Sequence, residues 1–128
     1  MSDVILDASA VLAMLRDEPG GDVVAAYVGR AAISAVNLQE VVKELLREGA
    51  SLEAARSVLD ELGLDVRAHD TDAAYRSADL YAPTKRYGRG LGDRTCMALG
   101  LQLGLPVLTT DREWRQVVVE GLILEHVR

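Results

Sequence analysis

The stretch Val4-Ile5-Leu6-Asp7 indicates the fold. Three apolar residues are followed by an acid, and the residues from Ala8 to Leu15 then have apolar side chains at helical spacing. A short continuous apolar run followed by such spacing is typical of a buried strand and then a helix. We therefore predict that Asp7 lies at the carboxyl end of a buried strand.

The same pattern returns near the other end of the chain. Pro106-Val107-Leu108 is followed by Thr109-Thr110-Asp111 and by a second helix-like stretch, residues 112–118. In an open α/β sheet, ligands bind in the crevice outside the carboxyl ends of the strands. We therefore expect Asp7 and Asp111 to be neighbours at that edge.

Strands and helices alternate along the rest of the sequence. Further strands are predicted at residues 32–34, 64–67 and 122–127, and helices at 22–28, 38–46, 51–62, 70–85 and 93–103. This alternation predicts a mostly parallel sheet covered on both faces. At 128 residues, the chain is expected to form a single domain, residues 1–128.

Composition narrows the classes of function. The chain has no Phe, one Trp and four Tyr, so an extended aromatic platform for stacking bases is not expected. The formal net charge of −6 argues against broad electrostatic attachment to nucleic acid, so such a partner needs a local basic patch or bound metal ions. The single cysteine, Cys96, excludes an internal disulfide and a multi-thiolate metal site, and it indicates a reducing compartment. We expect a cytosolic protein.

Four acids stand where elements begin or end: Asp7, Glu40, Asp93 and Asp111. Each has a structural explanation. Asp7 and Asp111 can cap the helices that follow them. Asp93 suits the positive end of a helix dipole, and Glu40 follows Asn37 at the spacing of a capping-box variant.

Asp93 is the hardest of the four to explain structurally. By helical spacing it shares a face with Cys96, Gly100 and Leu103, so its carboxylate lies at the top of an apolar stripe. A buried carboxylate needs a compensating partner. Several carboxylates without His or Cys make a hard oxygen site, which suits Mg²⁺ or Mn²⁺ rather than zinc.

Four local strings carry a resemblance to a known family. They are Asp7-Ala8-Ser9, Ser34-Ala35-Val36-Asn37-Leu38-Gln39-Glu40, Leu91-Gly92-Asp93-Arg94-Thr95-Cys96-Met97-Ala98 and Leu108-Thr109-Thr110-Asp111-Arg112-Glu113-Trp114. In this order they resemble the motifs of PIN domains, and most closely those of VapC-type toxins from bacterial toxin–antitoxin pairs. The resemblance spans nearly the whole chain.

The resemblance implies a three-layer α/β/α domain with Mg²⁺-dependent endoribonuclease activity, inhibited by a VapB-like antitoxin. Asp7, Glu40, Asp93 and Asp111 match the acidic quartet of the family, both as catalytic residues and as metal ligands. Ser9 and Thr109 match supporting hydroxyl positions. Two further acids, Glu44 and Glu113, lie close enough in sequence to be confused with members of the quartet.

Basic residues lie beside the acids in the sequence. Lys85, Arg86, Arg89 and Arg94 border Asp93, and Arg112 and Arg115 border Asp111. They are either a solvated surface or a track for RNA phosphates leading to the acids.

Other assignments remain open at the level of sequence. A receiver-type signalling domain also carries acids at strand ends, but here Asp7 has no acidic neighbour and no Lys follows Leu108. A catalytically silent PIN-like binding module is a second alternative. We also expect a homodimer, for which the apolar helices at residues 21–28 and 51–62 are candidate surfaces, as they are for the antitoxin.

Overall fold

The computed structural model describes residues 1–128 and is built around one five-stranded sheet. The strands are β1 (Val4–Leu6), β2 (Ala31–Ser34), β3 (Asp65–Arg67), β4 (Val107–Thr109) and β5 (Leu124–His126). The helices are α1 (Ala8–Leu15), α2 (Gly21–Ala25), α3 (Ala35–Arg47), α4 (Leu52–Asp60), α5 (Thr71–Ala78), α6 (Leu91–Leu103) and the 3₁₀ helix η1 (Arg112–Gln116). None of these helices has both the length and the apolar composition that a membrane span requires.

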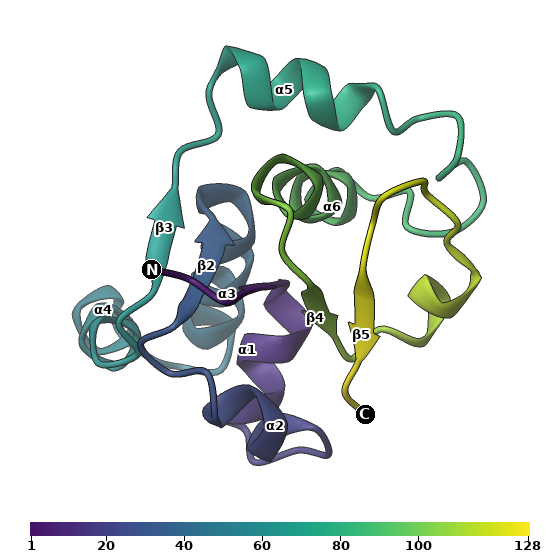
Figure 1. Ribbon diagram of the computed structural model, residues 1–128. Coiled ribbons are helices and arrows are strands. Elements are labelled where there is room, and N and C mark those ends of the chain that lie inside the picture. The colour runs from purple at the N-terminus through teal and green to yellow at the C-terminus, as the bar shows by residue number, and fades with distance from the viewer.

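The strand order explains where a site can form. All neighbouring strands are parallel and the order is β3-β2-β1-β4-β5, so the chain moves outward from β1 in one direction and then crosses to its other side (Figure 1). The reversal between β1 and β4 creates a crevice at their carboxyl ends. A receiver domain has the order 2-1-3-4-5, so the receiver alternative is wrong.

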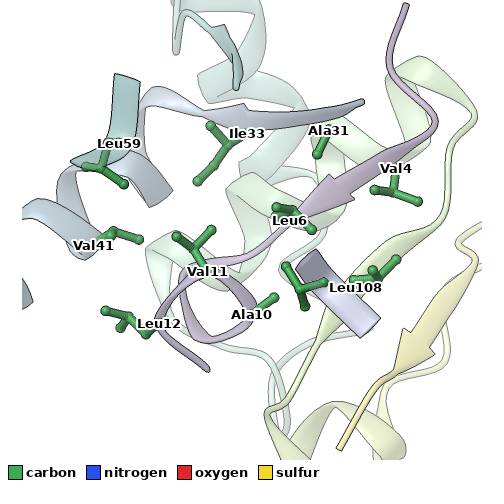
Figure 2. Close-up of a cluster of buried hydrophobic side chains, with 11 residues drawn as sticks. Val4, Leu6, Ala10, Val11, Leu12, Ala31, Ile33, Val41, Leu59 and Leu108 are labelled. Carbon is green, nitrogen blue, oxygen red and sulfur yellow. The ribbon is translucent and has the colours of Figure 1, made fainter. Parts of the chain in front are cut away.

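Helices cover both faces of the sheet, which confirms the three-layer α/β/α architecture. One face of the sheet packs on α1, α2, α3 and α4 through residues such as Leu6, Ile33 and Leu108 (Figure 2). The opposite face packs on α6 and η1 through Ile5, Ala32 and Val107. Adjacent strand residues therefore point to opposite layers, which is why the central strands β1, β2 and β4 start with continuous apolar runs, whereas the edge strands β3 and β5 include charged residues. Helix α5 lies outside α6 and packs on it (Figure 1).

Several element boundaries differ from the prediction. The helix predicted at residues 70–85 ends at Ala78, and turns follow. Pro83 prevents the helix from continuing to residue 85, because the residue before a proline is disfavoured in helical conformation and the proline itself donates no hydrogen bond. The helix ends earlier still, in turns where the backbone N–H groups of Leu80 and Tyr81 bond three residues back. The stretch predicted as a helix at residues 112–118 is the short 3₁₀ helix η1. The helix predicted at 22–28 spans Gly21–Ala25.

Candidate active site

Asp7 lies at the carboxyl end of β1 and caps α1, as both interpretations of the sequence predicted. Its Oδ1 accepts hydrogen bonds from the Ala10 backbone N at 2.8 Å and the Ser9 Oγ at 2.7 Å. Its Oδ2 accepts one from the Thr109 Oγ1 at 2.7 Å. Only 5% of the residue is exposed, and this burial raises the pKa of Asp7 to about 6, with the charge of Asp93 contributing. The three donors partly offset the rise.

Ser9 and Thr109 connect β1 with β4. Their hydroxyl oxygens lie 3.3 Å apart, and the Ser9 Oγ also accepts a hydrogen bond from the Thr110 backbone N at 3.0 Å. The Thr109 Oγ1 accepts one from the Asp111 backbone N at 3.0 Å, and the Asp111 Oδ1 caps η1 by accepting from the Glu113 N at 2.9 Å. These bonds hold the two strand ends, and with them Asp7 and Asp111, at one edge of the sheet.

Asp93 lies in the first turn of α6, at the same edge. Its Oδ2 accepts a hydrogen bond from the Gly90 backbone N at 3.2 Å. Burial raises the pKa of Asp93, and the negative charges of Asp111 and Glu40 raise it further. Because Asp93 also raises the pKa of Asp7, it is the member of the quartet that interacts electrostatically with all the others.

Glu40 reaches this region from the second turn of α3. Its Oε1 accepts a hydrogen bond from the Nδ2 of Asn37 at 2.8 Å, and the same amide donates to the Gly92 backbone O at 3.0 Å. A Cβ at residue 92 would overlap the Glu40 carboxylate, so a larger residue there would displace this carboxylate from its present position. Asn37 is buried and fixes α3 against the start of α6.

No basic side chain compensates these carboxylates. All the ion pairs of the chain involve other acids. No group of three or more Asp, Glu, His or Cys side chains surrounds one point in this conformation, so the fit to a cation rests on charge and donor chemistry. Raised pKa values in two adjacent acids, and a set of ligands made only of oxygen, suit a hard divalent ion such as Mg²⁺.

Trp114 was not singled out from the sequence as a residue of the site. It is the largest fully buried side chain and it lies in η1, three residues after Asp111. Its indole N–H partly offsets the rise in the pKa of Asp93, yet it completes no hydrogen bond of normal geometry. A buried donor directed toward the acids is a signal that only the three-dimensional structure provides. The carbonyl oxygen of the Asn37 side chain is likewise buried without a partner.

Cys96 and the two histidines do not add nucleophiles to this site. Cys96 is fully buried, and burial, together with the charges of Asp7 and Asp93, keeps the pKa of its thiol well above the usual value. His69 is exposed. His126 is partly buried, and its Nδ1 lies 3.3 Å from the Nη2 of Arg115.

The basic residues divide into two groups. Lys85, Arg86, Arg89 and Arg112 are exposed. Arg94 is half-buried, and its Nε donates to the Thr84 Oγ1 at 2.8 Å. Glu44 differs from the quartet because it pairs with three basic residues, whereas Glu113 is exposed, as Glu40 is, and contributes its backbone N–H to the Asp111 carboxylate.

Solved structures with this fold include several toxin–antitoxin proteins. The DNA-bound VapBC from Salmonella typhimurium matches with a TM-score of 0.71 and 22% identity, covering 98% of this chain and 98% of that chain. VapBC2 from Rickettsia felis, bound to a promoter DNA fragment, matches with a TM-score of 0.70 and 17% identity over 95% and 96%. VapBC-5 from Mycobacterium tuberculosis matches with a TM-score of 0.63 and 23% identity over 98% and 99%.

Sequence comparison gives a family but no individual relative. No curated protein matches the sequence. The sequence model of the PIN domain matches residues 4–120, which include all four acids and both supporting hydroxyls. The chain therefore belongs to the PIN domain family.

Proposed function

We propose that this protein is a Mg²⁺-dependent endoribonuclease, the toxin of a VapBC-type toxin–antitoxin pair. The main observation in support is the group of four acids at the sheet edge. Two of them have raised pKa values, and none has a basic partner. A carboxylate group of this kind is destabilising unless a cation joins it. The family membership and the fold shared with VapBC complexes support the same assignment.

The proposed roles of the residues follow from their surroundings. Asp7, Glu40, Asp93 and Asp111 hold Mg²⁺, for which Mn²⁺ is the natural substitute. When bound, the metal activates a water for attack on a phosphodiester bond and stabilises the leaving oxygen. Ser9 and Thr109 keep the Asp7 carboxylate in one orientation through the two short hydrogen bonds, both 2.7 Å long. The fixed orientation limits the reorganisation that binding would otherwise require.

A VapB-like antitoxin is the proposed protein partner. Three of the similar structures are VapBC or toxin–antitoxin complexes from bacteria, which supports a partner of that type. An uncompensated acidic edge also favours a partner that presents a basic side chain to Asp93 and Asp111. Exchanging these two acids for Asn should therefore weaken capture of the product of the neighbouring gene. Antitoxin affinity that is unchanged by both exchanges would place the interface elsewhere.

The exposed apolar residues of α2 and α4 support the homodimer that we also propose. Val23, Leu52 and Val58 are each more than 40% exposed. A single copy would leave these side chains in water, whereas a second copy would cover them. Sedimentation of the purified chain tests this part of the proposal, and a monomer at all concentrations would exclude it.

Cleavage of total cellular RNA with and without metal tests the enzymatic proposal. Activity should require Mg²⁺ or Mn²⁺ and should disappear in chelator. The products should carry 5′-phosphate and 3′-hydroxyl ends, because water attacks the phosphorus directly. Cleavage that persists in chelator and leaves cyclic phosphates would contradict the metal assignment. Metal binding without any cleavage would instead favour the catalytically silent binding module.

A further inference from the structure

A second feature lies on the other side of the first turn of α6, between that helix and α5. It is a cleft of about 640 Å³, which we call the α5–α6 cleft, lined among others by Val36, His69, Tyr81, Leu91 and Arg94. Its volume is within the range of pockets that bind small molecules. From its chemistry we infer that the α5–α6 cleft binds the base of one RNA nucleotide that flanks the bond to be cut. This inference rests on the proposed ribonuclease function.

The charge of the cleft differs from that of the chain. The protein carries 20 acids against 14 Lys and Arg, yet no acid lines the cleft. Two cations lie against the exposed ring of Tyr81: the guanidinium carbon of Arg94 is 5.4 Å from the ring centroid and the Lys85 Nζ is 5.5 Å from it. Neither cation has an acidic partner within 4.0 Å. A local cationic surface in an acidic protein favours an anionic polymer as the occupant.

A hydrogen bond to the buried side chain of Thr84 fixes the orientation of Arg94. The Thr84 side chain is completely buried, donates to the Leu80 backbone O and accepts a hydrogen bond from the Arg94 Nε at 2.8 Å. The two terminal nitrogens of Arg94 make no hydrogen bond or ion pair within the chain. A guanidinium held in one plane, with free donors, is suited to a base or a phosphate.

Residues that line the cleft are direct neighbours in sequence of residues of the acidic site. Val36 and Arg94 line the cleft, and their neighbours in sequence, Asn37 and Asp93, belong to the acidic site. The two sites are separated by one helix, whose full width is about 10–12 Å. A single strand can therefore contact both at once.

Base recognition explains the remaining lining of the cleft. Apolar walls from Val36 and Leu91, together with the ring of Tyr81, suit the faces of a base, whereas His69 offers a hydrogen-bonding group for its edge. Specific readers of RNA stack unpaired bases on aromatic or guanidinium planes in this manner. The low aromatic content of the chain limits the prediction to a single base.

Binding of single-stranded RNA by the full-length Asp7→Asn protein in Mg²⁺ tests the inference without cleavage. A fluorescent random-sequence pool is measured first, and its tightest-binding member is used for the comparisons. Tyr81→Ala should weaken binding at least about fivefold, the lower end of the effect of losing one stacked base, and should leave the salt dependence unchanged. Tyr81→Phe should restore binding, because the ring remains. Thr84→Val should also weaken binding although it removes no charge.

Tyr75→Ala is the matched control, because Tyr75 is an exposed tyrosine of α5 that does not line the cleft. The same oligonucleotide is then made with an abasic site at each position in turn. Each abasic oligonucleotide is tested with the Asp7→Asn protein and with the same protein carrying Tyr81→Ala. When the missing base is the one that stacks on Tyr81, the two proteins should bind with equal affinity. This should happen at one position only. Equal binding by the Tyr81→Ala and Tyr75→Ala proteins would overturn the inference and leave the ribonuclease proposal intact.

Two further outcomes separate the inference from the function on which it rests. If no protein of the series binds RNA, the inference is wrong, whereas the ribonuclease proposal is decided separately by cleavage with the unchanged protein. If Tyr81→Ala weakens capture of the co-expressed antitoxin but leaves RNA binding unchanged, the cleft takes a protein side chain and the inference is wrong.

Discussion

Two acidic regions one helical turn apart on α3 have opposite electrostatics. Glu44 lies within 4.0 Å of Arg16, Lys43 and Arg47. The hydrogen bond from Arg47 lowers the pKa of the Glu44 carboxyl most, and Lys43 lowers it further. Glu40 has no basic partner and instead adds to the charge that raises the pKa of Asp93. The first region is already neutralised within the chain.

The comparison separates an acid that is neutralised within the chain from acids that have no partner within the chain. The ion pairs of Glu44 are on the surface, where each is worth little and any acid can be accommodated. At the sheet edge, burial and mutual repulsion raise pKa values and nothing in the chain relieves them. The fold therefore retains an unfavourable charge at one place only, which is a property of sites that bind cations.

Asp7→Asn changes the buried acid of the sheet edge and should have the largest effect on activity. The exchange preserves the size of the side chain and much of its capping ability, but removes the charge that we propose holds the metal. RNA hydrolysis should fall by at least about a hundredfold, comparable to the loss of one group that stabilises the transition state. Cleavage assays with Asp60→Asn, an exposed acid at the end of α4, provide the control.

Although Asp7→Asn should reduce RNA hydrolysis, it should increase the stability of the metal-free protein. The pKa of Asp7 is about 6 in the folded state against 3.8 ordinarily, so folding favours the protonated form. The penalty on the native protein is therefore absent below about pH 4, grows as the pH rises from about 4 to about 6, and stays constant above that. Asp7→Asn should raise the unfolding free energy at pH 8 by about 1–3 kcal/mol and not at pH 4. A melting temperature sharply lowered at pH 8 would make Asp7 structural.

Glu40→Gln and Glu44→Gln compare the two regions directly, since both residues lie on α3. Glu40→Gln should reduce metal-dependent cleavage by about 10–100-fold, the usual effect of disturbing a metal site. Glu44→Gln should leave cleavage unchanged and lower the unfolding free energy by at most about 1 kcal/mol, as for a surface ion pair. Equal cleavage by the two variants would remove Glu40 from the site.

The pH dependence of metal binding follows from the same pKa values. Metal ligands must be deprotonated, so a proton on Asp7 competes with Mg²⁺ once the pH falls below about 6. The affinity should then decrease about tenfold per pH unit, whereas it should change little between pH 7 and 8. The fluorescence of Trp114 is a direct readout, because it is the only tryptophan and its indole N–H is directed toward Asp93. Affinity that is constant down to pH 5 would exclude Asp7 as a ligand.

The sequence was sufficient to predict the architecture, because local patterns determine it. Apolar runs such as Val4–Leu6 are continuous, and capping residues such as Ser51 stand at the helix starts. The placement of Asp7 and Asp111 at one edge followed from strand polarity alone. Endpoints were less predictable: the helix starting near Asp70 has favourable residues beyond Ala78, and only the turns that lead to Pro83 end it.

The supporting residues of the site were harder to predict than its acids. Asn37 was explained as part of a cap, but its amide in fact joins Glu40 to the backbone of Gly92, 55 positions away in sequence. Thr84 and Tyr81 carried no sequence signal, because their relation to Arg94 depends on how α5 packs on α6. Contacts between elements distant in the chain leave no local pattern.

The smallest predicted effect concerns cations rather than acids, and it applies the same distinction between paired and unpaired charges. Lys85, Arg86 and Arg89 are exposed and have no acidic partner. If they follow RNA phosphates, changing all three to Ala should reduce the slope of log affinity against log salt by about 0.7 per lost contact, or roughly two in total. The control is a second triple-Ala variant that changes the net charge equally but removes cations already paired with acids, namely Arg30, Arg47 and Arg67. Because a general effect of net charge would reduce both slopes alike, only a selective reduction in the first variant supports a phosphate track, and equal slopes would return Lys85, Arg86 and Arg89 to the solvated surface.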